Sequence, residues 1–503
     1  MNYKLNKDTS SIAERICKIN GIDESILDVS DLKVDYDLEV LSRFKETLLS
    51  DKDKRFFIVG DYDCDGICAT VIIRRLLSDL GIEANYYIPS RSKQGYGLNN
   101  EIVKTAYDNG FEALICVDNG VVAYEQMEYA KSLGLKTYII DHHEYNIQNE
   151  VDGFLHPSLF PDTYHDMCAA GLCCLLSNSF REDYLSTVYG GMATLADMVE
   201  VLGYNRYLLK QMIRLLNETE IYPIKYLLSG NEITYDSLSY NVIPKINAVS
   251  RLEEMMNVNY VVRFLSDNSS ECMKYLNKIE EINKTRKDMT TEMSALAQRL
   301  CNENDSFIVI RSEVFKEGLC GLIANRLLNT YNRPILILSE KDGELKGSGR
   351  APAGFDMFGY LHETKDIFSA YGGHAQAVGL SMNVDQYDSL IEYIDNHPFD
   401  FEVSEKEVLY LEQDELTDSL IEQIEELRPY GQGFSEPLLC IDGNYLKRFN
   451  IKGLYPKFVL NDKVEAISFN SSFIDKDFTM MIGHLKHDNY HKNKLSFVIE
   501  DLI

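Results

Sequence analysis

The chain has 503 residues, of which 45% are hydrophobic and 26% are charged, and its formal net charge at pH 7 is -29. This length predicts roughly two to four domains, and the composition excludes an intrinsically disordered protein. The net charge excludes nucleic-acid binding through a broad basic surface, so any polyanion must be held by a local cluster of basic groups.

Neither a targeting segment nor a membrane span is indicated by the sequence. The first eight residues lack the apolar stretch of a signal peptide, and no segment approaches the ~18 apolar residues that cross a bilayer. The eleven cysteines contain no CxxC pair, which argues against a disulfide framework or a zinc knuckle. We therefore expect a soluble, cytoplasmic protein with reduced thiols.

Strands and helices are expected to alternate after a helical extension over residues 1–50. A buried strand over 56–59 leads through a turn into a helix over 67–80, which ends at Gly81. The same alternation continues with strands over 84–88, 113–117 and 136–140 and helices over 101–109 and 124–133. This pattern predicts a parallel sheet covered on both faces, with ligands bound beyond the carboxyl ends of the strands.

The rest of the chain divides into further regions. A helical stretch over 168–218 precedes a long amphipathic run over 269–301, which is expected to be one connecting helix. A second α/β lobe begins with a strand over 306–310, and short β-type segments from about residue 405 suggest a small barrel. The predicted domains are 1–50 (N-terminal helical extension), 51–215 (first α/β lobe), 216–302 (helical connector), 303–400 (second α/β lobe) and 401–503 (barrel).

Acidic residues follow the first predicted strand. Asp61, Asp63 and Asp65 alternate in a turn closed by Gly66. Carboxylates this close raise one another's pKa unless a cation neutralises them, so a metal is the simplest explanation. An ordinary acidic loop or Asx-turn is the alternative for this segment alone.

Further metal-ligand residue types end two other strands of the same sheet. Asp118 follows the strand over 113–117, and Asp141, His142 and His143 follow the strand over 136–140. Asp197 lies among apolar residues, where an unpaired carboxylate is unfavourable. Carboxylates and imidazoles without thiolates favour Mn²⁺ or Mg²⁺ over a structural zinc. Together these segments predict a metal site.

The segments resemble the signature motifs of the DHH phosphoesterase family, named for the sequence Asp-His-His found here at 141–143. Within that family the chain is similar to RecJ-type single-strand-specific exonucleases from about residue 50 to its end. Other segments that fit are Ile88-Pro89-Ser90-Arg91, Gly95-Tyr96-Gly97-Leu98, Gly347-Ser348-Gly349-Arg350, Gly372-Gly373-His374-Ala375 and Leu427-Arg428-Pro429-Tyr430-Gly431. The resemblance implies a DHH domain and a DHH-associated domain joined by a long helix, followed by a C-terminal OB-like β-barrel.

The resemblance also implies a set of site residues. Two divalent cations, Mn²⁺ or Mg²⁺, would be held by Asp61, Asp63, Asp118, His142 and Asp197, with Asp118 as a bridge. His143 would face the scissile phosphate, while Asp65 and Asp141 would complete the catalytic motif, Asp141 by orienting a ligand imidazole. The expected substrate-binding residues are Arg91, Tyr96, Asn247, Arg251, Ser348, Arg350, Gly372, Gly373 and His374. Without the family, Arg350 could equally belong to a tight turn, and His374 could be a packing residue.

The implied activity is hydrolysis of single-stranded DNA in the 5' to 3' direction, with release of mononucleotides. One ion would lower the pKa of a bound water, and both would neutralise charge during in-line attack of hydroxide on phosphorus. Single-stranded DNA is the expected partner, with a single-strand-binding protein or a helicase as a candidate supplier, no membrane contact and a monomeric state.

Other activities are open. A nanoRNase or cyclic-dinucleotide phosphodiesterase of the same family would act on shorter substrates, and a catalytically silent relative would serve as a scaffold. An inorganic pyrophosphatase is disfavoured, because Phe57 stands where those enzymes have a histidine. Ser250 departs from the glycine that RecJ-type exonucleases commonly place before the arginine, so the backbone near Arg251 is expected to differ.

Overall fold

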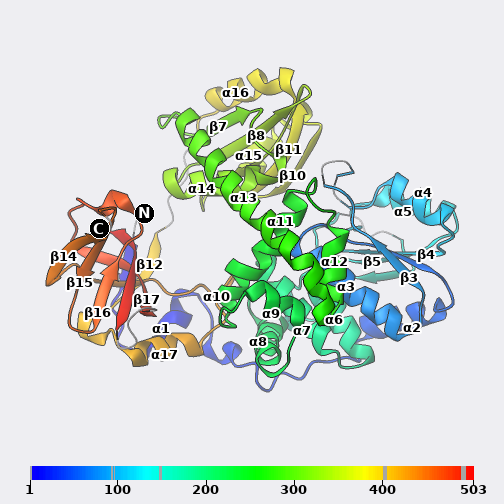
Figure 1. The fold of residues 1–503 in the computed structure, drawn as a ribbon, viewed down its shortest axis with the longest axis horizontal. Helices are drawn as coiled ribbons and strands as arrows, with labels where there is room; N and C mark the ends of the chain where they lie inside the picture. The colour runs from blue at the N-terminus through cyan, green and yellow to red at the C-terminus, as the bar shows by residue number, and fades with distance from the viewer. Residues whose placement is uncertain are drawn as a thin grey trace.

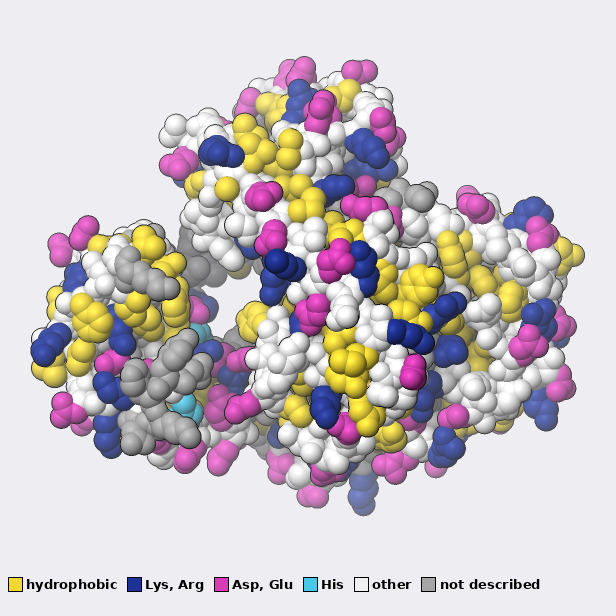
Figure 2. Space-filling view, viewed as in Figure 1, with side chains coloured by type: hydrophobic (Ala, Val, Ile, Leu, Met, Phe, Trp, Pro, Cys, Tyr) yellow, Lys and Arg dark blue, Asp and Glu magenta, His cyan; other side chains and the backbone are white. Residues whose placement is uncertain are grey.

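The protein is described by a computed structural model covering residues 3–91, 94–95, 97–146, 150–399, 405–451, 453–488 and 494–503. Three β-sheets form three regions of the molecule, and helices connect them (Figure 1). Aspartate and glutamate side chains are spread over all three regions rather than gathered in one (Figure 2). Within the described chain, no helix has both the length and the apolar character needed to cross a membrane.

The first sheet confirms the predicted parallel α/β architecture. Its strands have the order β3-β2-β4-β5-β6 and are all parallel. They are β2 (Phe56–Val59), β3 (Ala84–Tyr87), β4 (Ala113–Val117), β5 (Lys136–Ile140) and β6 (Gly153–Leu155). Every residue of β2 and β4 is buried, because helices cover both faces of the sheet.

The two faces of this sheet belong to different cores. Ile58 and Ile115 pack with α3 (Cys64–Asp79), while Val59 and Leu114 pack with α4 (Asn100–Asp108) and α5 (Tyr124–Ser132). The strand order reverses between β2 and β4, so their carboxyl ends form the crevice where open α/β sheets bind ligands.

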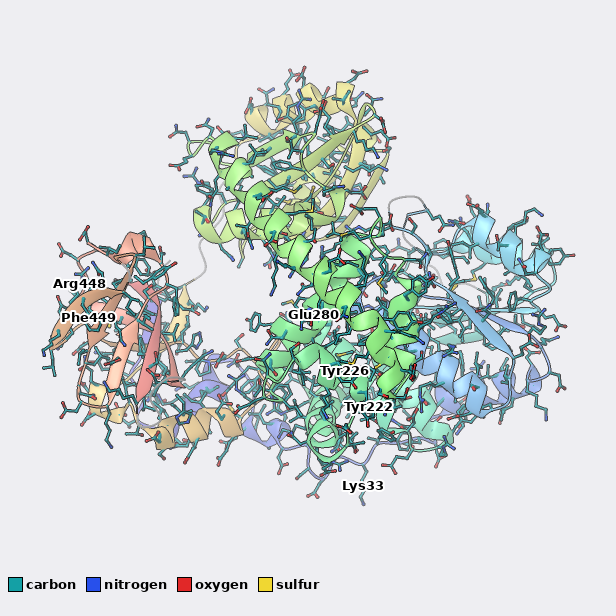
Figure 3. All side chains as sticks on the ribbon, viewed as in Figure 1. Lys33, Tyr222, Tyr226, Glu280, Arg448 and Phe449 are labelled. Carbon is teal, nitrogen blue, oxygen red and sulfur yellow. The ribbon has the colours of Figure 1, made fainter. Side chains whose placement is uncertain are left out.

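Helices connect this sheet to the second one. The connecting helices are α6 (Ala169–Phe180), α7 (Tyr184–Ala196), α8 (Gly203–Glu218), α9 (Tyr222–Leu228), α11 (Ile243–Arg251), α12 (Asn259–Ser266) and α13 (Met273–Leu300). Tyr222, Tyr226 and Glu280, labelled in Figure 3, lie in this helical region. The long helix predicted over 269–301 is α13, which spans 28 residues and packs on α11 and α14 (Cys320–Tyr331).

The second sheet has the order β10-β11-β9-β8-β7. Its strands are β7 (Ile308–Ser312), β8 (Ile335–Lys341), β9 (Glu344–Arg350), β10 (Ala370–His374) and β11 (Ala377–Asn383). Only β7 and β8 pair in parallel, and β9, β10 and β11 pair antiparallel. Helices α14, α15 (Met357–His362) and α16 (Tyr387–Asn396) accompany it.

The third sheet has eight strands in the order β1-β12-β13-β17-β18-β16-β15-β14. They are β1 (Tyr3–Asn6), β12 (Lys406–Tyr410), β13 (Leu439–Asp442), β14 (Lys447–Ile451), β15 (Tyr455–Val459), β16 (Val464–Ile467), β17 (Met480–His487) and β18 (Leu495–Leu502). Helix α17 (Asp418–Glu426) and helix α1 (Ile12–Ile19) lie near it. Arg448 and Phe449 of the edge strand β14 lie on its outer side (Figure 3).

Two expectations for this region are corrected. Among the described residues the sheet is open rather than a closed barrel, because β1 and β14 are its two edges and do not pair with each other. The N-terminal extension is also not wholly helical, since β1 pairs in parallel with β12. A strand of four residues carries too little periodicity to be recognised, and its partner lies some four hundred residues away in the sequence.

Candidate active site

The first acidic segment is a tight turn between β2 and α3. Asp63 caps the helix, and its Oδ1 accepts hydrogen bonds from the backbone N–H groups of Asp65 at 2.9 Å and Gly66 at 3.2 Å. A Cβ at Gly66 would lie 2.6 Å from the backbone of Asp61, so the turn requires glycine there. Asp63 Oδ1 therefore forms the hydrogen bonds of an Asx-turn, as the alternative interpretation expected. The same turn fixes the position of Asp61.

Asp118 lies at the end of β4 in an uncommon backbone conformation. Its φ is 59°, in the left-handed region, and its side chain is buried. The neighbouring Asn119 amide donates to the carbonyl oxygens of Val59 at 3.1 Å and Val117 at 2.9 Å, which ties the ends of β2 and β4 together. Such strained residues often occur at functional sites, where the surrounding structure holds them.

All five residues expected to bind metal are brought together. His142 Nε2 lies 3.4 Å from Asp118 Oδ1 and 3.5 Å from Asp197 Oδ2, and Asp197 directly follows α7. Among the described residues, three overlapping groups have ligand atoms within 4.8 Å of one another: Asp61, Asp63 and Asp118; Asp118, His142 and His143; and Asp65, His142 and Asp197. Asp118 and His142 each belong to two groups, which is the arrangement expected if adjacent cations share ligands.

The electrostatics of the cluster favour cations. Burial, reinforced by the charge of Asp63, raises the pKa of Asp61 well above its usual range, and burial with the charge of Asp65 does the same for Asp118. Asp61 Oδ1 is buried and has no hydrogen-bond partner among the described residues. Burial lowers the pKa of His142, which favours the neutral imidazole that a metal needs. The oxygen and nitrogen donors present fit Mn²⁺ or Mg²⁺.

The cluster predicts a pH-dependent stability of the metal-free protein. Burial, with the charge of Asp65, raises the pKa of Asp197 from 3.8 to about 8. The folded protein then keeps a proton that the unfolded chain has already lost, so this contribution to stability is present at low pH and disappears as the pH rises through about 8. With a chelator present, we expect the melting temperature of Asp197→Asn to rise relative to the unsubstituted protein as the pH approaches 8. If the melting temperature of Asp197→Asn instead fell relative to the unsubstituted protein over this range, the assignment would be contradicted. Added Mn²⁺ should favour the unsubstituted protein and so reverse the expected difference.

Asp141 organises the loop that carries the two histidines. Its Oδ1 accepts from the backbone N–H of His142 at 2.8 Å and lies 2.8 Å from His143 Nδ1, while its Oδ2 accepts from Val121 N at 3.1 Å. Burial lowers the pKa of His143, but the hydrogen bond and charge of Asp141 outweigh it and raise the pKa to about 9. The imidazole that Asp141 orients is therefore that of His143, whereas the sequence had suggested a ligand imidazole.

His156 supports the same loop and was missed by the sequence analysis. Its Nε2 lies 3.1 Å from the carbonyl oxygen of His143, and its Nδ1 lies 2.8 Å from Ser158 Oγ. His156 directly follows β6, a strand that the sequence analysis did not assign. Recognising that fourth strand end would have placed His156 beside the other motifs.

Asp65 links the first acidic segment to α6. Its two carboxylate oxygens accept from the backbone N–H groups of Ala169 and Ala170, each at 2.8 Å, at the start of that helix. A carboxylate at a helix N-terminus is stabilised by the unpaired N–H groups there. This contact gives Asp65 a positioning role in addition to its place near His142 and Asp197.

We expect Asp65→Asn to destabilise the protein by ~1–3 kcal/mol, because the amide NH₂ would face a backbone N–H and leave it unsatisfied. Urea denaturation with a chelator present measures this effect without contributions from metal binding. Asp23→Asn, at an exposed cap of a short helix, is the control and should lose much less stability than Asp65→Asn. Equal losses in the two variants would contradict the special role of Asp65.

The glycine-rich residues of the second lobe lie on antiparallel strands. Ser348 faces Gly379, which faces Gly372, and Arg350 faces Ala377, which faces His374. Residues directly opposite each other, and alternate residues of one strand, share a face of the sheet. Ser348, Arg350, Gly372 and His374 therefore lie on one face, whereas Gly373 belongs to the other.

This shared face is open. A Cβ at Gly372 or Gly379 would meet no atom of the described chain within 4 Å, so their backbone is open toward a ligand. Gly373 is needed for a different reason, because its φ is 137° and a Cβ there would lie 2.2 Å from the carbonyl oxygen of Ala377.

Arginines from both lobes lie within electrostatic reach of one another and of Asp63. Burial lowers the pKa of Arg251 to about 10, with further lowering from the charges of Arg91, Arg286 and Arg350, while Asp63 opposes the shift. Arg251 Nη1 donates to the carbonyl oxygen of Gly318 at 3.0 Å. Arg251 thus lies within electrostatic reach of both the Asp63 carboxylate and the Arg350 guanidinium.

The remaining predicted substrate residues are placed less completely. Asn247 lies on α11 one turn before Arg251, and its Oδ1 is buried without a partner among the described residues. The Arg91 guanidinium lies 5.2 Å from the centre of the Tyr62 ring, and Tyr96 lies outside the described residues. Ser250 does not disrupt the backbone, because its hydroxyl donates to the carbonyl oxygen of Asn247 at 3.1 Å and α11 continues to Arg251.

Three family models match the chain: "DHH family, N-terminal domain" over residues 55–196, "DHHA1 domain" over 292–397 and "RecJ OB domain" over 409–501. With the carboxylate and imidazole cluster at the strand ends, these matches define the class of protein, and the chain belongs to the DHH family. The third of these models is named for RecJ.

Individual relatives agree with this assignment. The single-stranded-DNA-specific exonuclease RecJ of Bacillus subtilis is 27% identical over 81% of this chain and 54% of its own length, so the chain spans about half of that relative. The RecJ of Escherichia coli is 27% identical over 78% of this chain and 75% of its own. The structure of Thermus thermophilus RecJ with Mn²⁺ has a TM-score of 0.84 at 20% identity and covers 100% of this chain and 79% of that one. This last likeness shows the fold.

Proposed function

We propose that the chain is a metal-dependent, single-strand-specific exodeoxyribonuclease that acts in the 5' to 3' direction and releases mononucleotides. The observation that carries this proposal is the carboxylate and imidazole cluster of the first lobe, with arginines of both lobes within electrostatic reach of it. The Bacillus subtilis and Escherichia coli relatives, named as single-stranded-DNA-specific exonucleases, support it.

Asp61, Asp63, Asp118, His142 and Asp197 would hold two divalent cations, Mn²⁺ or Mg²⁺. When bound, the cations would lower the pKa of water and neutralise charge that develops at phosphorus. Structures of Thermus thermophilus RecJ in complex with Mn²⁺ and with Mg²⁺ support this choice of metals.

The residues of the chain would orient the substrate. Asp141 orients the His143 ring through Nδ1, and His143 would contact an oxygen of the scissile phosphate. Arg251 and Arg350 would bind a phosphate near the end of the strand, and guanidinium groups suit this role because their donors match phosphate oxygens in pairs. The open backbone at Gly372 would let the strand approach closely.

A local cluster of this kind reconciles a polyanionic substrate with a net charge of -29. In the cell, a helicase or a single-strand-binding protein would supply the strand, and the chain would act as a monomer in the cytoplasm. These features of the proposal rest on the exonuclease assignment.

Digestion of labelled DNA tests the proposal. Single strands labelled at the 5' or the 3' end, and the matching duplex, are incubated with Mn²⁺, with Mg²⁺ or with a chelator. We expect the 5' label to appear at once as a mononucleotide, the 3'-labelled strand to shorten gradually, and the duplex and the chelated reaction to show no cleavage. A preference for dinucleotides over long strands would instead favour the nanoRNase alternative, and release from the 3' end would refute the polarity.

A further inference from the structure

A cavity lies on the first lobe, where the edge strand β3 meets the start of α12. Its volume is about 610 Å³, within the ~300–1,000 Å³ typical of small-molecule sites. Its lining includes Arg74, Tyr86, Tyr87, Asn259, Tyr260 and Arg263, none of which belongs to the candidate active site. Over the region of α12 and β3, Figure 2 shows basic side chains beside yellow ones, the colour that includes tyrosine.

The charge of this cavity is unlike that of the protein as a whole. The chain has 79 acidic and 50 basic residues, yet no aspartate or glutamate is among the described residues that line the cavity. The lining of the described cavity offers Arg74 and Arg263 no carboxylate. Arg263 interacts instead with the hydroxyl groups of Tyr86 and Tyr275. The positive charge of the two guanidinium groups is therefore not neutralised by an acidic residue of the cavity lining.

Each arginine is instead stacked near a tyrosine. The guanidinium carbon of Arg74 lies 5.6 Å from the ring centre of Tyr86, and that of Arg263 lies 5.3 Å from the ring centre of Tyr260. Tyr260 is 43% exposed, so part of its ring surface is accessible to a ligand. The Tyr260 and Tyr275 rings are also neighbours, with centres 5.8 Å apart.

The cavity is held in shape by Asn259. Its side chain accepts a hydrogen bond from Ile88 N at 2.9 Å and donates one to the carbonyl oxygen of Ile88 at 3.1 Å. The Asn259 amide thereby pairs with the backbone of Ile88 in the way that a neighbouring strand does. The Tyr86 hydroxyl donates to the carbonyl oxygen of Asn259 at 3.3 Å. Arg91 follows Ile88 by three residues, so the cavity lies next to the chain segment that leads to the candidate active site.

We propose that this cavity binds a nucleotide unit, with its base against the Tyr260 ring and its phosphate at Arg74 and Arg263. Aromatic rings bind any base through its flat face, and arginine forks match phosphate oxygens. The ligand is either a nucleotide of a single strand beyond the cleavage site or the free mononucleotide product. The identification of this ligand as a nucleotide rests on the proposed function. The cavity itself is separate from the candidate active site.

A fluorescence titration tests the proposal. The chain has no tryptophan, so Tyr260→Trp introduces a single reporter into the cavity. In the presence of a chelator, which prevents hydrolysis, this variant is titrated with deoxyadenosine monophosphate and with a short oligothymidylate. We expect saturable quenching by at least one of the two, and at least a tenfold weaker affinity when Arg263→Ala is added.

A matched control is Arg214→Ala, an exposed arginine on α8 that removes the same charge and should leave the affinity unchanged. Quenching by the oligonucleotide alone would identify the strand as the ligand, and quenching by both would identify a site that also accepts the free nucleotide. No quenching by either, or quenching that Arg263→Ala does not weaken, would overturn the proposal. Calorimetric titration of the unsubstituted protein and of Arg263→Ala repeats the test without the tryptophan.

The two proposals fail separately. Arg74→Ala and Arg263→Ala should retain metal-dependent hydrolysis of a short strand, because neither residue lies in the candidate active site. A protein without nuclease activity would still be measurable by quenching, since the titration contains no free metal.

Discussion

Replacement of Asp118 by asparagine is expected to abolish metal-dependent hydrolysis and to raise the melting temperature of the metal-free protein. The loss of activity should be on the order of 10³-fold or more, or ~4 kcal/mol in the barrier, because the carboxylate shared by two ligand groups disappears. Stability should rise because the buried carboxyl group, whose pKa is raised by burial and by its acidic neighbours, no longer has to ionise. Asparagine keeps the side-chain shape and tolerates the φ of 59°.

Nuclease assays with Mn²⁺ and thermal melts with and without the metal measure both effects. Mn²⁺ should raise the melting temperature of the unsubstituted protein and leave that of Asp118→Asn nearly unchanged. Glu144→Gln is a suitable control, since Glu144 is an exposed carboxylate next to His143, and it should retain activity. Retained activity in Asp118→Asn, or a lower melting temperature without metal, would contradict the metal site.

Replacement of Arg206 by methionine is expected to cause the largest loss of stability among single substitutions outside the acidic cluster. Arg206 is 0% exposed, and its guanidinium donates to Leu27 O at 2.8 Å and Pro429 O at 2.9 Å. It also donates to Leu427 O at 2.6 Å and to Arg428 O at 3.3 Å. One side chain of α8 thereby joins the N-terminal segment to the segment that leads into the third sheet.

Methionine would fill much of the volume but leave these buried carbonyl groups unsatisfied, at ~1–3 kcal/mol each. We therefore expect a loss of about 3 kcal/mol or more, measured by urea denaturation, together with faster proteolysis near residue 427. Arg214→Met on the same helix removes an exposed ion pair with Glu218 and should change stability by ~0.5 kcal/mol or less. Similar losses in the two variants would show that the buried contacts of Arg206 are not special.

The predicted elements that form the first sheet were recovered because their signals are local. The run from Phe56 to Val59 is apolar at every position, and a buried parallel strand has this composition. Once the strands were assigned as parallel, Asp61, Asp118 and His142 had to meet at one edge. The presence of this cluster therefore followed from the sequence.

Two kinds of contact were not recoverable in this way. Asp65 could not be paired with the N-terminus of α6, because the two segments are distant in the sequence. Asp141 could not be paired with His143 rather than His142, because the loop conformation sets the directions of the side chains within one motif. The same holds for Arg206, whose partners lie in segments far away in the sequence.

The third region shows the same limit at the level of a whole sheet. Its short β segments were expected to close into a barrel, but closure depends on which strands become edges. Here β1, from the opposite end of the chain, pairs with β12, and β14 remains the other edge.

The sequence by itself thus determined the α/β class, the order of the motifs and the residues that gather at the strand ends, because periodicity and strand direction are properties of neighbouring residues. Only the tertiary structure decided which imidazole Asp141 orients, which helix Asp65 caps, how the lobes present their arginines and where an acid-free cavity lies. The first of these depends on the conformation of one loop. The others depend on packing between residues that are far apart in the chain, which no local pattern records.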